Sequence, residues 1–80
     1  MADRPLTSSQ AAILARLQAH PKHGLLSGHM ISGRRAAWAK PRLHALLRRG
    51  LVERHATNVE RWYATSAGRD LDLTGEAAHA

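Results

Sequence analysis

The chain has 80 residues, a net charge of +6 and no cysteine. A chain of this length builds one domain with a thin core, large enough for two or three helices and a hairpin. The absence of cysteine excludes a disulfide framework and a thiolate metal site. No apolar run approaches the roughly 20 residues that span a membrane, and the N-terminus lacks the apolar segment of a secretory signal. We therefore expect a soluble, cytoplasmic protein that does not bind a membrane.

Basic residues dominate the first two thirds of the chain. No Asp or Glu occurs between Arg4 and Val52, whereas most of the Lys and Arg residues lie in that stretch. Such a distribution creates an electric field of one sign. It favours a polyanionic partner, which can be nucleic acid or the acidic face of another protein.

The first predicted element is a helix over about 8–20. Thr7 and Gln10 have the spacing of a capping box at its start, and Pro21 follows its end. The apolar residues that share one face of this helix are Ala11, Ile13, Leu14 and Leu17. We expect residues 1–6 to form a flexible arm, 7–73 the folded domain and 74–80 a flexible tail.

A short second helix is expected over about 28–35. Ser27 would cap it, and Met30 and Ile31 would face the core. Arg34 and Arg35 close it, at the end of the helix where cations suit the dipole.

The third predicted helix covers about 40–49, with Pro41 as its first helical residue and Gly50 as a left-handed cap. Trp38, in the preceding turn, is expected to plug the core. At 100° per residue the predicted inner face comprises Ala39, Leu43, Leu46, Leu47 and Gly50. The outer face then comprises Pro41, Ala45 and Arg48, with His44 on one flank and Arg42 and Arg49 on the other.

Two alternating segments follow and predict a β-hairpin of about 51–55 with 59–65. Asn58 in the turn between them tolerates a positive φ. Alternation along the second strand places Trp62 and Ala64 inward and Tyr63 outward. Thr65 is the expected cap of a short final helix or turn.

The stretches LHALLRRGLVER and RWYATSAGRDL carry a resemblance to a known family. They resemble the winged helix-turn-helix domains of small bacterial transcription regulators, notably the MarR- and PadR-like groups. In those domains the third helix ends in a leucine pair, Gly-Leu-Val leads into the first wing strand, and a segment like 64–71 closes the wing. The resemblance covers about 7–71 and implies an α+β fold, mostly α, with three helices and a two-stranded β-wing.

The resemblance also implies that helix 40–49 lies in the major groove of DNA while the wing, about 55–61, contacts the backbone or the minor groove. The implied base-reading residues are Arg42, His44, Ala45 and Arg48. The implied backbone or wing contacts are Arg34, Arg35, Lys40, Arg49, Asn58, Arg61 and Tyr63.

The physical chemistry of the third helix agrees with this implication. Pro41 and Ala45 are small enough for close approach to a duplex, and Arg42 is long enough to reach a base edge or a phosphate. Lys40 lies at the predicted helix N-terminus, where the dipole disfavours a cation. We interpret this position as favouring a phosphate neighbour.

The sequence therefore predicts sequence-specific binding of double-stranded DNA by a bacterial or phage transcription regulator associated with the nucleoid. The alternative is a winged-helix interaction module whose basic face docks on an acidic protein, such as a host factor or part of the transcription machinery. The short flanks leave no room for the dimerisation helices of the family, so a monomer and a dimer through another surface both remain open.

Neither catalysis nor metal binding is expected, and we predict no cofactor. His20, His23 and His29 are close in sequence, but no cysteine or carboxylate accompanies them and their spacing crosses a turn. The carboxylates are scattered late in the chain, and no glycine-rich phosphate loop occurs. The protein is thus not expected to be an enzyme.

Overall fold

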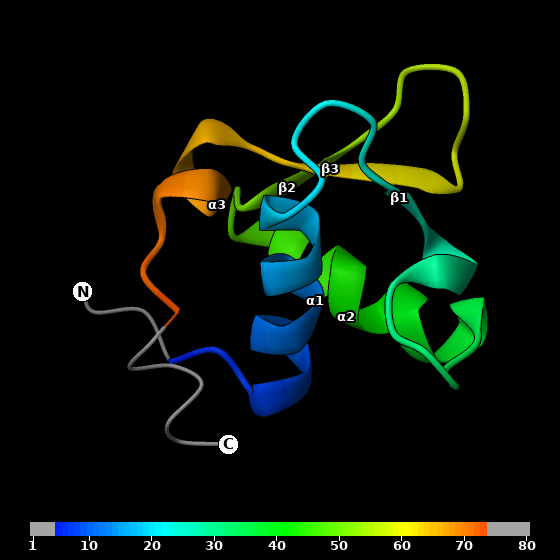
Figure 1. Ribbon diagram of the computed structural model, residues 1–80, viewed down its shortest axis with the longest axis horizontal. Coiled ribbons are helices and arrows are strands. Elements are labelled where there is room, and N and C mark those ends of the chain that lie inside the picture. The colour runs from blue at the N-terminus through cyan, green and yellow to red at the C-terminus, as the bar shows by residue number, and fades with distance from the viewer. Residues whose placement is uncertain (1–4, 74–80) are drawn as a thin grey trace.

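The computed structural model describes residues 5–73. They form an α+β structure whose elements are α1 (Ser8–Gln18), β1 (Leu25–Leu26), a single 3-10 turn η1 (Ser27–His29), α2 (Ala36–Arg48), β2 (Val52–Arg54), β3 (Arg61–Ala64) and α3 (Ser66–Asp70). In Figure 1, α1 and α2 lie on one side of the strands, and α3 lies at the end of the sheet away from the β2–β3 loop. The predicted tail 74–80 and residues 1–4 of the predicted arm lie outside the described residues.

Helix α1 begins where its sequence predicts and ends at Gln18, two residues before the expected end. The Thr7 hydroxyl accepts a hydrogen bond from the Gln10 amide at 3.2 Å, and the Gln10 side chain accepts one from the Thr7 amide at 3.1 Å. This capping box satisfies two amides that the first turn would leave without acceptors. The four residues of the predicted apolar face, Ala11, Ile13, Leu14 and Leu17, are all buried.

The predicted second helix over 28–35 is wrong. Only η1 is helical there, and Ser27 does not cap it. The segment carries two glycines and a β-branched residue, Ile31, all of which lower helix propensity. Gly33 has a φ of +80°, which ends any helical continuation before α2 begins.

Helix α2 begins at Ala36, four residues before the predicted start. Pro41 is therefore inside the helix and not its first residue. A proline at this position removes one amide, whose acceptor would be the Ala37 carbonyl. Because Ala37 and Pro41 are both exposed, the missing hydrogen bond lies on the solvent side of the helix. Gly50, at a φ of +75°, ends the helix in the left-handed conformation that the sequence predicts.

The predicted hairpin is present, with shorter strands and an additional partner. β2 and β3 pair antiparallel in a register that places Glu53 opposite Tyr63. β1, which the sequence did not indicate, pairs with the other edge of β3, so the sheet order is β1-β3-β2. Trp62 and Ala64 are buried, as the alternation predicts, and Tyr63 is on the opposite face.

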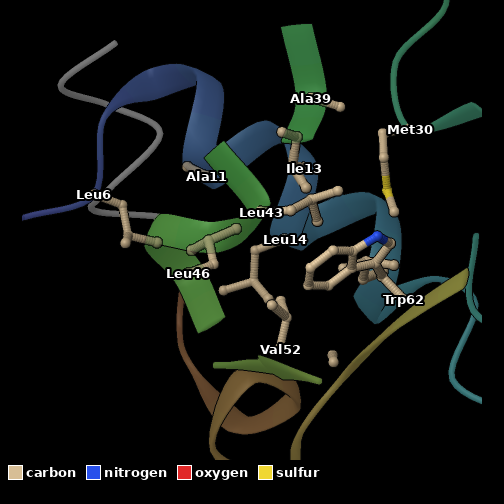
Figure 2. Close-up of a cluster of buried hydrophobic side chains, with 12 residues drawn as sticks. Leu6, Ala11, Ile13, Leu14, Met30, Ala39, Leu43, Leu46, Val52 and Trp62 are labelled. Atoms are coloured by element: carbon tan, nitrogen blue, oxygen red, sulfur yellow. The ribbon is translucent and has the colours of Figure 1, made fainter. Parts of the chain in front are cut away.

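The core lies between α1, α2 and the inner face of the sheet (Figure 2). Its buried apolar residues are Leu6, Ala11, Ile13, Leu14, Leu17, Met30, Ala39, Leu43, Leu46, Val52, Trp62 and Ala64. Leu6 extends this core by one residue into the predicted arm. Leu47, predicted to face inward, is 37% exposed because it lies about 100° around the helix from buried Leu46. Trp38 packs against the core but is only partly buried.

Gly68 in α3 permits a close approach to the backbone of Leu51. A Cβ at this position would overlap the Leu51 carbonyl. We expect Gly68→Ala to lower the free energy of unfolding by about 1–3 kcal/mol, because backbone must move to admit the methyl group. Urea denaturation measures this change. Gly28→Ala is the matched control, since a Cβ there meets nothing within 4 Å, and it should change stability by less than about 0.5 kcal/mol.

Replacing Pro41 should make the protein more stable. A proline in a helix interior costs about 3 kcal/mol relative to alanine, and its rigidity in the unfolded chain returns at most about 1 kcal/mol. We therefore expect Pro41→Ala to raise the free energy of unfolding by about 1–2 kcal/mol in urea denaturation. Pro21→Ala, in the exposed α1–β1 turn, should have the opposite sign. A loss of stability in both variants would contradict this interpretation of Pro41.

Candidate nucleic-acid interface

The exposed face of α2 is the side of the helix that the sequence predicts. Ala37, Pro41 and Arg48 are exposed and Ala45 is half-buried, whereas Ala39, Leu43 and Leu46 face the core. The exposed face therefore carries short side chains that project little from the helix, with one long cationic side chain, Arg48, near its C-terminal end. Helix α2 contains no carboxylate.

Arg42 lies on the flank of α2 that faces α1, and its guanidinium is already engaged. It donates to the Ser9 hydroxyl at 3.1 Å and to the Trp38 carbonyl at 2.6 Å. Its Cζ atom also lies 4.4 Å from the centroid of the Trp38 ring. These contacts hold Arg42 between two helices, so a base contact by this residue would have to replace part of them.

Arg34 and Arg35 precede the first turn of α2 and are both exposed. The guanidinium of Arg34 lies 5.3 Å from the centroid of the same Trp38 ring. Arg35 is the N-cap residue of α2. Two cations thus stand at the start of α2, where the sequence placed them at the end of a separate helix. Arg49 is the C-cap residue at the other end.

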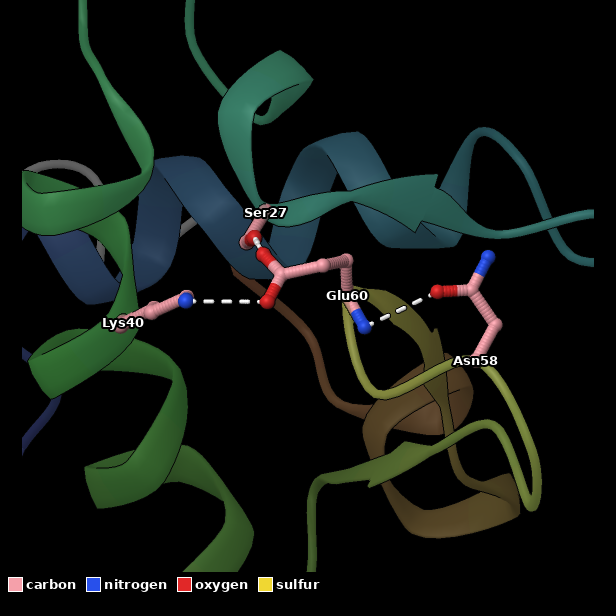
Figure 3. Close-up of polar contacts among 4 residues, drawn as sticks. All are labelled: Ser27, Lys40, Asn58 and Glu60. Atoms are coloured by element: carbon pink, nitrogen blue, oxygen red, sulfur yellow. Dashed lines mark hydrogen bonds and ion pairs between the residues drawn. The ribbon is translucent and has the colours of Figure 1, made fainter.

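Lys40 lies on the flank of α2 that faces the hairpin, and it is paired. Its ammonium group is 2.9 Å from a carboxylate oxygen of Glu60, and the other oxygen accepts a hydrogen bond from the Ser27 hydroxyl (Figure 3). The expectation that Lys40 stands at the helix N-terminus is wrong, because α2 starts four residues earlier. The dipole no longer argues for a phosphate beside it.

Glu60 is the residue that the sequence analysis missed. It is the last residue of the β2–β3 loop, directly before β3, and its side chain links three segments: η1, the hairpin and α2. Both side chains of its ion pair with Lys40 are 44% exposed, so water and salt screen the attraction. The pair therefore positions the two side chains and neutralises their charges locally, and it contributes little to the stability of the fold.

Trp62 and Arg54 line a small hollow between α2 and the hairpin. Its volume is about 130 Å³, and Lys40, His44 and Glu60 also line it. His44 meets the Trp62 ring edge-on, with centroids 5.4 Å apart, and the Arg54 guanidinium lies 4.9 Å from the same ring. The predicted DNA-contacting His44 is thus half-buried, with part of its ring used in packing.

The hairpin turn is built by side-chain acceptors and not by a positive φ at Asn58, since no described residue other than glycine has a positive φ. The Asn58 side chain accepts a hydrogen bond from the Glu60 amide at 3.1 Å. His55 Nδ1 accepts hydrogen bonds from the Thr57 and Asn58 amides at 3.1 and 3.0 Å. The turn is therefore held in one shape without glycine.

Arg61 and Tyr63 lie on the outer face of the sheet. Arg61 donates to the His23 carbonyl at 2.6 Å, which joins β3 to the α1–β1 turn. The Tyr63 ring stacks on His55 with centroids 6.0 Å apart. Both predicted wing contacts therefore have partners within the fold.

Potential metal ligands are dispersed over residues 5–73. No group of three potential metal ligands lies together in that part of the chain. The histidines at 20, 23 and 29 are exposed and form no such group. No described helix is long and apolar enough to cross a membrane.

The pKa of the Glu60 carboxyl lies below its ordinary value of 4.5. The hydrogen bond from Ser27 is the main cause, followed by the contact with Lys40, and the charge of Arg54 adds to them. Partial desolvation acts in the opposite direction. The carboxylate is therefore ionised throughout the neutral range.

Glu60 should make a small, pH-dependent contribution to stability. Because its pKa is lowered in the folded protein, the carboxylate stabilises the fold above about pH 4.5, and this contribution is lost as the pH falls through the lower folded-state pKa. We expect the urea midpoint of Glu60→Gln to fall below that of the parent at about pH 7 and to approach it at about pH 3. A difference that is equal at both pH values would contradict this role.

Comparisons of the chain with models of protein families, with curated proteins and with solved structures found no match.

Proposed function

We propose that this protein is a winged helix-turn-helix DNA-binding protein, a transcription regulator without catalytic activity. In this proposal α2 enters the major groove of double-stranded DNA, and the β2–β3 loop acts as the wing. The element order, the three-stranded antiparallel sheet and the position of the hairpin beside α2 support the assignment. The short η1 takes the place of the first helix of the motif.

The observation that carries the proposal is the exposed face of α2. It is about 20 Å long, has no carboxylate and is built of small side chains at Ala37 and Pro41, with Arg48 beyond them. A low helix face can approach base edges in a groove about 12 Å wide, and a methyl group such as that of Ala37 can contact a thymine methyl. Arginine is the side chain best suited to the O6 and N7 atoms of guanine.

The contacts within the fold narrow the set of residues that can bind DNA directly. Arg48, Arg34 and Arg35 present guanidinium groups at the two ends of the exposed face. Arg42 and Arg61 are held by carbonyl oxygens, so we assign them to positioning α2 and the hairpin, with a DNA contact as a secondary role. Lys40 reaches a phosphate only by leaving Glu60.

Salt dependence of duplex binding tests the function. We expect a labelled duplex of arbitrary sequence to bind with about four to six phosphate contacts. At a slope of about −0.9 per contact, affinity should fall about 10²–10³-fold between about 50 and 200 mM salt. Fluorescence anisotropy measures both affinities, and selection from a random duplex library then reports sequence preference.

Two single-charge variants locate the interface. Arg48→Gln should weaken binding and reduce the salt slope by about one contact. Lys22→Gln removes the same charge from the exposed α1–β1 turn and should leave affinity within about twofold. Equal losses in both variants would mean that net charge alone drives binding, and the assignment to α2 would fail. Absence of duplex binding at low salt, with binding to an acidic polypeptide, would support the interaction module instead.

A further inference from the structure

A second basic feature lies away from the hairpin, between α1 and the start of α2. The loop from η1 to α2 borders an open hollow of about 550 Å³. The residues that bring polar side chains to it are Arg16, His29, Ser32, Arg34 and Arg35. Gly28 and Gly33 also line it, and a Cβ at either glycine would meet nothing, so the wall is open at these points.

The hollow gathers three guanidinium groups without a counter-charge. Among residues 5–73, no Asp or Glu lines the hollow, and no carboxylate lies at ion-pair distance from Arg16, Arg34 or Arg35. Three like charges around one concavity repel one another, and an anion between them removes that repulsion. Lys40, by contrast, has the Glu60 carboxylate beside it.

Two of the three arginines are held in place by contacts that leave some of their N–H groups available as hydrogen-bond donors. The Nε–H of Arg16 donates to the Met30 carbonyl at 3.1 Å, which fixes the plane of its guanidinium. Arg34 is positioned by the Trp38 ring. The terminal amino groups of Arg16 form no hydrogen bond with the described residues, so they can donate to an oxyanion that enters the hollow.

Arg35 adds the end of a helix to this cluster. It is the N-cap residue of α2, and its guanidinium has no acceptor that could cap the first turn, whereas the hydroxyls of Thr7 and Thr65 cap α1 and α3. The positive end of the α2 dipole therefore adds to the charge of the arginines.

We propose that this hollow binds a phosphate group. A phosphate carries up to two charges on oxygens that accept hydrogen bonds from several directions, which matches planar guanidinium forks arriving from α1 and from the η1–α2 loop. Its carrier is a free phosphorylated molecule or a nucleic-acid backbone, and the chemistry of recognition is the same for both. The proposal does not depend on the groove contacts of α2.

Pyrophosphate is the probe that tests the site. At constant ionic strength, with chloride as the balancing anion, we expect saturable shifts of the Gly28, Ser32 and Gly33 amide resonances in heteronuclear NMR spectra. Arg35→Gln and Ser32→Asp should each weaken binding at least about tenfold, because one removes a cation and the other introduces a carboxylate. Both residues are exposed, so the variants should keep the parent spectrum elsewhere.

Arg48→Gln is the matched control, since it removes a cation from α2 outside the hollow and should bind pyrophosphate as the parent does. Shifts that do not saturate, that chloride reproduces, or that persist unchanged in Arg35→Gln and Ser32→Asp would overturn the proposal, whatever the protein does with DNA. If the protein binds pyrophosphate saturably but binds no duplex, the phosphate site in the hollow is supported and the function proposed for α2 fails.

A duplex titration of the same variants identifies the carrier. If Ser32→Asp weakens pyrophosphate and duplex binding together, the hollow accepts a backbone phosphate, and the DNA path extends from α2 toward α1. If it weakens pyrophosphate binding alone, the hollow accepts a free phosphorylated molecule.

Discussion

Burial of the Trp62 side chain is the interaction that the arrangement of the basic surface depends on. Trp62 is 1% exposed, and its burial stabilises the fold by about 4–6 kcal/mol at ordinary values of area and transfer energy. Its Nε1 finds no acceptor among the described residues, which costs about 1–3 kcal/mol and leaves the balance favourable. Leu25 of β1 pairs with it in register, Arg54 of β2 covers its ring and His44 of α2 meets its edge. The sheet and α2 are thus oriented about one indole.

The sequence predicted best the elements whose signals are local. The caps at Thr7 and Thr65, the left-handed Gly50 and the alternation around Trp62 each lie within a few residues of the feature they specify, and all four are found. The start of α2 was misplaced because its N-cap has no side-chain acceptor, while Pro41 carries the strongest start signal in the segment. Strand β1 is two residues long, too short for any period, and exists because β3 offers an edge.

In the candidate site, too, the features with local signals were predictable and those that depend on distant partners were not. Which side of α2 faces solvent follows from the helical period, and the prediction is confirmed for Ala39, Leu43 and Leu46. It is wrong for Leu47 and Gly50, which are exposed. The state of each cation on the flanks does not follow from any period. It depends in large part on partners 20 or more positions away in the chain, such as Ser9 for Arg42 and Glu60 for Lys40, although Arg42 also contacts Trp38 four positions away. Only the folded structure separates the arginines that are held from those that present their donors.

The ion pair between Lys40 and Glu60 affects the salt dependence that DNA binding would show. A lysine that contacts a DNA phosphate normally displaces the salt cations condensed on the DNA and loses its own salt anions, and the released ions produce the salt dependence. Lys40 instead brings a counterion that is covalently part of the protein, and that carboxylate stays behind. A contact made by Lys40 therefore releases fewer ions in total than a contact made by Arg48. The number of phosphates counted from a salt titration would be a lower bound on the number touched.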